Sequence, residues 1–503
     1  MMNIPSKFLP IRIMFLILCA ISLLAACAPA STVDPLPSAT ATQQASPTPT
    51  NLPTPTPEPS PTPTPLPLNG QQTQYFIDAE INYYNRFLNV TSRVIYTNKT
   101  KVPIEEIVFI IYPTIFQNAI YIRSVADGEG RPVAEYRWES HRMVIPLETP
   151  LLPGEQISFV HDYELYMPDR SGVFGQTGRQ LLLSYWYPTI PPFDEEQGWL
   201  AYEISLVNSM FVGEHQVFES ADFNVTVTFT DRAENMVIAA GPLPQVENGT
   251  YQFNLPLARA FVMAISDSFG IIEREVNGTL IKGYALPEVA DSSEVAVDLA
   301  EKALVLFTEV FGPYEREVLS VVQADMGINM EFDGLILIQS SFYWLYRDPP
   351  RSDLHIIIPH EVSHQWFFSL VGSNQPMEPW LDESITTYAE ALFYERYFPE
   401  DLDWWWQTRV HSHLPSGTID TSIYVNGGVP EYFNRVYRRG ALFYRDLRET
   451  MGDDAFFSFL MEYTQSHRYE IATSEDFWAT INAHTTADLT HLYDSYFSTS
   501  PTP

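Results

Sequence analysis

The segment with the clearest chemical meaning is His355-Ile-Ile-Ile-Pro-His-Glu-Val-Ser-His364, which contains a His-Glu-x-x-His motif. Residues four apart share one face of a helix, so His360 and His364 can present two imidazoles to a single zinc ion. Glu361 projects beside them, where its carboxylate can take a proton from the attacking water and later pass it to the leaving amine. The motif predicts a metal-dependent hydrolase, although such short motifs also arise by chance in helices with two unrelated histidines.

A third metal ligand is expected at Glu383, which follows His364 after eighteen intervening residues. Apolar patterning predicts helices over 354–370 and 380–397, and the break Gly372-Ser-Asn-Gln-Pro376 separates them. A helix, turn and helix in this order can return the Glu383 carboxylate to the metal. Two histidines and one glutamate leave one coordination position open, which is typical of catalytic zinc sites. We therefore expect one zinc ion per chain.

Metal-bound histidines usually donate their second N–H group to a carboxylate or a carbonyl. Thr387 and Glu390 lie one and two helical turns after Glu383, so each is a candidate for this supporting role. The alternative for both residues is ordinary helix packing. The aromatic run Tyr185-Trp-Tyr-Pro188 has two interpretations as well, because it can line a substrate cleft or fill a core.

The spacing of the three ligands resembles that of the aminopeptidase N family of zinc peptidases, the gluzincins. Thermolysin-type endopeptidases are similar but have a slightly longer gap. The flanking segments Pro359-His-Glu-Val-Ser-His-Gln-Trp-Phe367 and Glu378-Pro-Trp-Leu-Asp-Glu383 also resemble the surroundings of that family's zinc site. The resemblance covers residues 72–497 and implies a peptidase that acts on peptide substrates.

The resemblance implies two substrate-binding residues, Met330 and Glu331. Gly327-Ile-Asn-Met-Glu-Phe332 resembles the Gly-Ala-Met-Glu-Asn strand in which the family's glutamate binds the free α-amine of the substrate. This chain has Phe332 in place of the asparagine and one extra residue after the glycine. The alternative for Glu331 is a strand carboxylate that faces solvent, whereas an amine-binding carboxylate would disfavour blocked N-termini.

The resemblance also implies a catalytic role for Tyr437. The segment Val436-Tyr-Arg-Arg-Gly-Ala441 is similar to the family element whose tyrosine hydrogen-bonds the transition-state oxyanion. A phenol directed at the developing charge would stabilise it. The alternative is a tyrosine buried in a helix.

The elements that must position these residues change in type near residue 270. Residues 71–270 are rich in β-branched and aromatic runs with turn residues between them, as in 107–112, 156–160 and 223–229. Helical patterns dominate afterwards. We expect a multidomain fold, with an N-terminal all-β sandwich or saddle at 71–270. A thermolysin-like α+β zinc-peptidase domain with a helical C-terminal part would follow at 271–500.

The N-terminal residues have the pattern of a bacterial lipoprotein signal. Lys7 and Arg12 precede an apolar run at 13–24, and Leu24-Ala-Ala-Cys27 resembles a lipobox in which the new N-terminal cysteine is lipidated. We therefore expect a signal peptide at 1–26, lipidation of Cys27 and a Pro/Thr/Ser-rich linker at 27–70. The protein would be exported and lipid-anchored at the cell membrane, facing outward. The alternative is an ordinary signal peptide, cut after Ala26 or Ala30.

The net charge of −34, from 62 acidic and 28 basic residues, argues against nucleic acid as a partner. The only cysteines are Cys19 and Cys27, so the folded part forms no internal disulfide. The sequence does not indicate an oligomeric state.

The leading hypothesis is a zinc aminopeptidase that removes N-terminal residues from peptides at the cell surface, with Glu361 as general base. An endopeptidase or another hydrolase on the same zinc site is the first alternative, and dependence on a free N-terminus would distinguish the two. The second alternative is a catalytically idle surface binding lipoprotein. A zinc-uptake protein fits less well, because the chain has no His-rich tract.

Overall fold

The computed structural model describes residues 72–204, 214–231, 235–424 and 428–498. The predicted signal peptide at 1–26, the lipidated Cys27 and the linker at 27–70 lie outside the described residues. None of the described helices combines the length and the apolar composition that a bilayer span requires.

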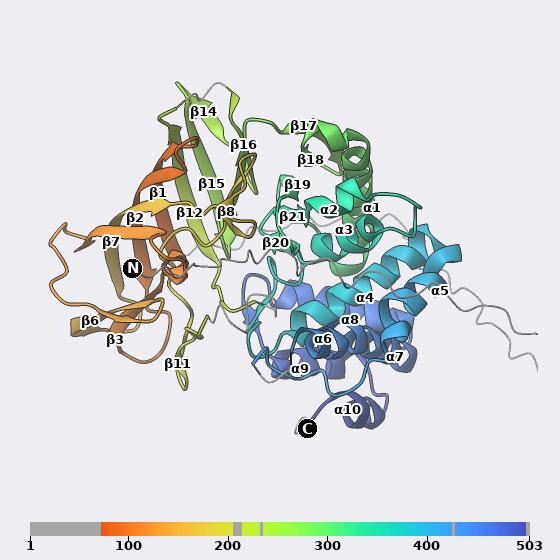
Figure 1. Cartoon of the computed structure of the whole chain (residues 1–503). Coiled ribbons are helices and arrows are strands. Elements are labelled where there is room, and N and C mark those ends of the chain that lie inside the picture. The colour runs from red at the N-terminus through yellow and green to blue at the C-terminus, as the bar shows by residue number, and fades with distance from the viewer. Residues whose placement is uncertain (1–71, 205–213, 232–234, 425–427, 499–503) are drawn as a thin grey trace, which may run out of the picture. The chain divides into compact units, whose positions relative to one another are not determined.

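The N-terminal part of the described chain is built from β-sheets (Figure 1). Its largest sheet has seven strands in the order β14-β15-β12-β1-β2-β7-β4, and β1 and β12 are its parallel pair. The strands are β1 (Thr73–Asn82), β2 (Phe87–Thr97), β4 (Ile120–Asp127), β7 (Gln156–Tyr166), β12 (Ala221–Phe229), β14 (Gln245–Glu247) and β15 (Thr250–Ala258). Buried and exposed side chains alternate along β1, which is the expected pattern when one face of a sheet is buried.

Two smaller sheets share a hydrophobic core with this sheet. The first has the order β13-β16-β9-β8, and the second has the order β3-β6-β5. Their strands are β3 (Ile104–Ile110), β5 (Arg137–Glu139), β6 (Arg142–Leu151), β8 (Phe174–Gln176), β9 (Leu181–Leu183), β13 (Val237–Ala240) and β16 (Met263–Ser266). The short hairpin β10 (Phe193–Asp194) and β11 (Gly198–Trp199) and the 3₁₀ turn η1 (Tyr112–Ile115) complete this part.

The second part of the chain begins with a five-stranded mixed sheet in the order β17-β18-β19-β21-β20. Its strands are β17 (Gly270–Val276), β18 (Thr279–Ala285), β19 (Val318–Ala324), β20 (Met330–Phe332) and β21 (Leu335–Gln339). Every residue of β19 is buried, as expected for a strand covered on both faces. The 3₁₀ turn η3 (Pro287–Val289) and helix α1 (Ala290–Phe311) connect β18 to the parallel strand β19.

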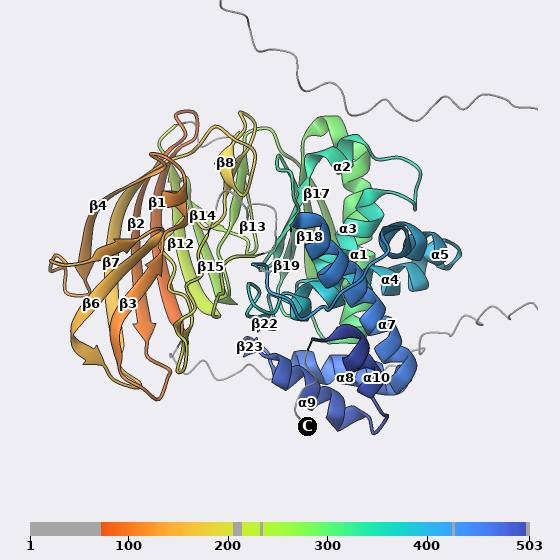
Figure 2. The ribbon, with the colours of Figure 1, turned by 60° about the horizontal axis from the view of Figure 1, so that its bottom comes forward.

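Helices dominate the rest of the chain (Figure 2). They are α2 (Ser340–Trp344), α3 (Asp353–Ser363), α4 (Trp380–Tyr397), α5 (Leu402–Trp405), α6 (Val429–Tyr432), α7 (Gly440–Met451), α8 (Asp453–Ser466), α9 (Ser474–His484) and α10 (Thr490–Tyr496). Two π-helices, η5 (Trp406–Val410) and η7 (Phe433–Arg439), interrupt them. The 3₁₀ turns η4 (Pro399–Asp401) and η6 (His411–His413) and the strand pair β22 (Gly372–Ser373) and β23 (Ile471–Ala472) complete the list.

The β part, the mixed sheet and the helical end confirm the predicted fold class. The exact domain boundary at residue 270 stays a prediction. The helix predicted over 354–370 is wrong beyond Ser363, where α3 ends. Trp366 turns into the core there, packs on Phe307 and donates its indole N–H to the Gly312 carbonyl at 2.9 Å. Burial of this side chain outweighs the apolar pattern that suggested a longer helix.

Arg259 and Asp333 join the β part to the second part of the chain, which begins with the mixed sheet. The buried Arg259 guanidinium donates to the carbonyl oxygens of Phe218 (2.9 Å), Phe368, Leu370 (3.3 Å) and Glu470 (2.8 Å). The Asp333 carboxylate accepts from the backbone N–H groups of Arg259 and Ala260, from the Arg316 guanidinium and from the Ser369 hydroxyl. Burial lowers the pKa of Arg259 to about 10, so the guanidinium keeps its charge at neutral pH.

We expect Asp333→Ala to lower the free energy of unfolding by about 3–5 kcal/mol, because it leaves buried donors without their acceptor. Denaturant unfolding followed by circular dichroism measures the change. Glu309, in an exposed ion pair with Arg396, is a matched control, and Glu309→Ala should cost about 1 kcal/mol or less. Equal effects of the two substitutions would show that the Asp333 network does not connect the two parts as described.

His161 makes the stability of the β part depend on pH. Burial lowers the pKa of its imidazole to about 3, whereas the ordinary value is about 6.5. Between these values the unfolded chain binds a proton that the folded chain excludes, so stability falls as pH drops below about 6.5. This residue alone should lower the free energy of unfolding by about 2 kcal/mol between pH 7.5 and pH 5. Denaturant titrations at both pH values should show a smaller loss in His161→Leu, and an unchanged loss would contradict the assignment.

Candidate active site

Helices α3 and α4 bring the three predicted metal ligands together. His360 and His364 lie one turn apart, at the end of α3 and just after it, and Glu383 lies in the first turn of α4. Glu383 Oε2 is 3.3 Å from His360 Nε2 and 3.6 Å from His364 Nε2. All three side chains are buried, and their ligand atoms lie within 4.8 Å of one another.

The chemistry of this group fits a zinc ion. Two imidazole nitrogens and one carboxylate oxygen form a donor set typical of catalytic zinc. Among the described residues, Glu383 Oε2 and Glu361 Oε2 are buried polar atoms without a hydrogen-bond partner. A buried carboxylate oxygen without a partner is costly, and a divalent cation would remove that cost for Glu383.

A carboxylate lies behind each imidazole. His364 Nδ1 is 2.7 Å from Asp382 Oδ1, and the other oxygen of Asp382 accepts from the Gln375 amide at 2.5 Å. His360 Nδ1 is 2.9 Å from Glu390 Oε1. Such contacts fix the ring orientation and leave Nε2 of each histidine directed toward the metal position.

Of the two supporting candidates from the sequence, Glu390 contacts a histidine and Thr387 does not. The Thr387 hydroxyl donates to the backbone carbonyl of Glu383 at 2.7 Å, within α4. Glu390 itself accepts from Arg409 on η5 at 2.9 and 3.0 Å and from the Trp405 indole at 3.0 Å. Sequence reasoning missed Asp382, although its position next to Glu383 was a usable signal. It also missed Arg409, whose pairing depends on tertiary structure.

The two remaining predicted carboxylates face the same site. Glu361 is buried, and burial raises its pKa to about 7, although the nearby His360 and His364 oppose that shift. Glu331 lies on β20 and is 5% exposed. Burial raises the pKa of Glu331 well above its usual range, while the nearby His364 lowers it.

Tyr437 lies on the π-helix η7, with its ring against His360, one of the three predicted metal ligands. The rings of Tyr437 and His360 are nearly parallel, with centroids 5.9 Å apart. Gly440, in the same segment, lets η7 and α7 approach α4 closely, because a Cβ there would lie 2.1 Å from Ser384 Oγ. The Ser384 hydroxyl donates to the Val436 carbonyl at 2.6 Å, so α4 and η7 are joined beside the site. Burial, followed by the charge of Glu383, raises the pKa of Tyr437 well above its usual range.

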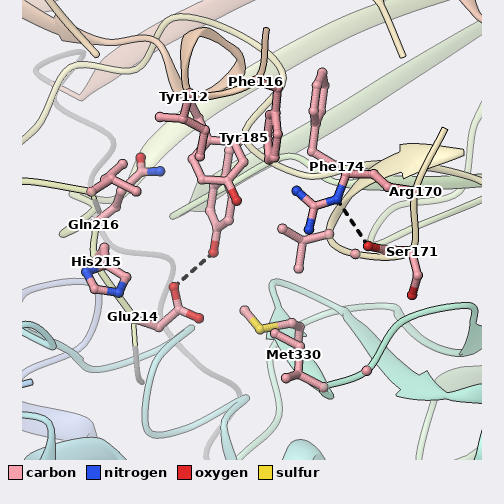
Figure 3. Close-up of a pocket in the computed structure, with 16 residues that line it drawn as sticks. Tyr112, Phe116, Arg170, Ser171, Phe174, Tyr185, Glu214, His215, Gln216 and Met330 are labelled. Atoms are coloured by element: carbon pink, nitrogen blue, oxygen red, sulfur yellow. Dashed lines mark hydrogen bonds between the residues drawn. The ribbon is translucent and has the colours of Figure 1, made fainter. Parts of the chain in front are cut away.

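A pocket opens next to these residues, between the β part and β20 (Figure 3). Met330 lines it from the catalytic part, and Tyr185 lines it from the β part. The other aromatic residues of that run fill the core, because the Trp186 indole donates to the Phe261 carbonyl and the Tyr187 hydroxyl accepts from the Phe261 N–H. The run therefore fills the core with Trp186 and Tyr187 and lines the pocket with Tyr185, and the role of that pocket in substrate binding stays a prediction. Sequence reasoning did not identify Glu214, which also lines the pocket.

Comparison with known proteins points to one family. The sequence model of the peptidase family M1 domain matches residues 295–496. The chain is 27% identical over 260 residues to aminopeptidase M1-D from Oryza sativa subsp. japonica, which covers 48% of the chain and 29% of that relative. It is 23% identical over 300 residues to aminopeptidase N from Lactobacillus helveticus, which covers 55% and 35%. The chain thus spans only about a third of the length of these curated relatives.

The fold matches that of a solved M1 zinc metallopeptidase variant from Deinococcus radiodurans, with a TM-score of 0.60 and 18% sequence identity. That alignment covers 86% of this chain and 96% of the other. A two-domain M1 zinc metallopeptidase bound to L-arginine is similar, with a TM-score of 0.59 and 17% identity. The predicted resemblance to the aminopeptidase N family is confirmed, because residues 295–496 match the peptidase family M1 domain and the fold matches that of M1 zinc metallopeptidases.

Proposed function

We propose that the protein is a zinc-dependent aminopeptidase that hydrolyses the first peptide bond of its substrates at the cell surface. The observation that carries the proposal is the convergence of His360, His364 and Glu383 within 4.8 Å. Glu361 lies beside them, and its Oε2 has no hydrogen-bond partner among the described residues. This arrangement fits hydrolysis better than a purely structural metal site, because it supplies a base next to an open coordination position.

Each residue of the candidate site has a separate role in the proposed reaction. When bound, the zinc ion would acidify the attacking water and polarise the scissile carbonyl. Glu361 takes the proton of that water and delivers it to the leaving amine. The Tyr437 phenol stays protonated at neutral pH because its pKa is raised, so it can donate a hydrogen bond to the developing oxyanion.

Glu331 gives the site its preference for a free N-terminus. Its carboxylate lies close enough to His364, Glu214 and Glu361 for their charges to shift its pKa, so it belongs to the same cluster as the base. A substrate ammonium that enters this cluster forms an ion pair with Glu331, which offsets its loss of hydration. An uncharged blocked terminus forms no such pair and leaves the Glu331 carboxylate without an opposite charge. The cell-surface location is part of the same proposal, and it rests on the signal-like residues before Cys27.

We expect Glu361→Gln to retain zinc and to lower kcat/KM by about 10²–10⁴-fold, because it removes the base and leaves the metal ligands intact. Aminoacyl fluorogenic amides measure the rate, and elemental analysis measures bound zinc. The exposed Glu449 serves as a control, and Glu449→Gln should keep full activity. A zinc-loaded wild-type protein that cleaves no peptide or amide would support the binding-lipoprotein alternative.

We expect the wild-type protein to cleave free aminoacyl amides and to leave their N-acetylated counterparts intact. Glu331→Gln should lower kcat/KM for the free substrates by about 10–100-fold, the usual loss of a charge-assisted contact. Parallel assays of both substrate sets on both proteins test this. Cleavage of the acetylated set by the wild-type protein would make endopeptidase the correct description.

A further inference from the structure

The pocket beside the candidate zinc site has an aromatic wall. Its volume is about 140 Å³. Tyr185, Tyr112 and Phe116 follow one another along the wall, with ring centroids 5.1 and 5.6 Å apart. Met330 lies across from these rings, next to Glu331 in the sequence (Figure 3). The pocket therefore extends from the predicted amine-binding region into the β part.

One end of this pocket holds the carboxyl group of Glu214, whose pKa burial raises to about 7, so a substrate ammonium beside it would favour its charged form. Its carboxylate accepts a hydrogen bond from the Tyr185 hydroxyl at 3.0 Å. The charges of Glu383, Asp382 and His364 act on Glu214, so this end faces the zinc site. The charge of Glu214 also raises the pKa of Glu331, so these two carboxyl groups, from two parts of the chain, lie near each other.

The other end carries a positive charge from Arg170. Its guanidinium carbon lies 4.7 Å from the centroid of the Phe116 ring. Its side chain donates one hydrogen bond, to the Ser171 carbonyl at 3.3 Å, and no carboxylate of the described residues forms an ion pair with it. Such a guanidinium is notable in a chain with 62 acidic and 28 basic residues. Figure 3 shows Arg170 and Glu214 on different sides of the pocket, with the rings of Tyr112 and Phe116 between them.

The backbone holds Arg170 in this position. Its N–H donates to the carbonyls of Pro168 at 2.9 Å and Gln176 at 3.1 Å. Gly175 makes the close packing possible, because a Cβ there would lie 2.4 Å from the Arg170 carbonyl oxygen. The guanidinium is therefore presented to the pocket by a fixed turn.

We propose that this pocket selects substrates whose first residue has an acidic side chain. The substrate ammonium binds Glu214 and Glu331, the methylene groups lie along the aromatic wall, and the side-chain carboxylate pairs with Arg170. This inference rests on the proposed aminopeptidase function and adds the substrate class.

The charges of the pocket support this orientation. Arg170, Tyr112 and Glu214 line the same pocket, so a substrate side chain in it meets one basic and one acidic group. A guanidinium–carboxylate pair formed against aromatic rings is stronger than the same pair in water. A lysine or arginine side chain would meet the like charge of Arg170 at the far end, which disfavours basic first residues.

The kinetic test compares glutamyl, glutaminyl, leucyl and lysyl amides, because glutamyl and glutaminyl differ only in the charge of the side-chain end. We expect wild-type kcat/KM to be at least tenfold higher for glutamyl than for glutaminyl, and Arg170→Gln to bring that ratio near one. Arg86 is ion-paired with Asp169 at 3.1 Å and does not line the pocket, so Arg86→Gln should keep the wild-type ratio.

A binding test separates this inference from the proposed function. Isothermal titration of the protein with isoglutamine and with glutaminamide requires no turnover, and both probes carry a free ammonium. We expect isoglutamine to bind at least tenfold more tightly, a preference lost in Arg170→Gln. Glu214→Gln should weaken both probes and keep their ratio.

The outcomes of the two tests are distinct. A wild-type protein that binds isoglutamine preferentially but cleaves no amide supports the pocket assignment and overturns the aminopeptidase proposal. Cleavage of free amides with a preference for leucyl or lysyl overturns the pocket assignment and leaves the aminopeptidase proposal standing. A glutamyl preference that survives Arg170→Gln also overturns the assignment.

Discussion

The site depends on how a group of buried carboxylates is neutralised. Glu331, Glu361, Asp382, Glu383 and Glu390 are each no more than 8% exposed. Buried charges of one sign are unfavourable unless opposite charges or hydrogen bonds compensate them. Arg409 compensates Glu390, and the imidazoles of His360 and His364 lie against the others. The remaining negative charge fits a divalent metal ion and the substrate ammonium of the proposed function.

The same strand joins this charge cluster to the rest of the fold. Glu331 and Phe332 lie on β20, and Asp333, directly after them, accepts hydrogen bonds from the β part. Gln365, next to His364, donates to the Phe332 carbonyl at 2.9 Å and accepts from the Gly334 N–H at 2.9 Å. These hydrogen bonds hold β20, and with it Glu331, against the segment that carries His364. Asp333 joins the same strand to the β part, so the position of the β part relative to Glu331 is fixed as well.

Most residues of the candidate site can be predicted from the sequence, because they lie in short segments that are recognisable by themselves. His360 and His364 are four apart, Glu383 is in the next helix, and Tyr437 lies in a recognisable segment. Period-two alternation likewise predicts the β part. The end of α3 at Ser363 was not predictable from apolar pattern, because the tertiary packing of Trp366 decides it. The roles of three further residues could not be predicted for a similar reason, because only the folded chain brings Arg409 near the histidines and Glu214 and Arg170 to the pocket.

The two parts of the chain supply different residues to the proposed reaction and to the proposed recognition of the first side chain. The proposed metal ligands, base and oxyanion donor all come from residues after 353, whereas Tyr185, Glu214 and Arg170 reach the pocket from the β part. Arg170 is fixed by the turn before β8 and makes no contact with the metal ligands. A change at Arg170 can thus alter which first residue is accepted while the distances among His360, His364 and Glu383 stay the same. In the proposed function, the preference for an acidic first side chain therefore depends on Arg170 in the β part, whereas hydrolysis depends on α3, α4 and η7.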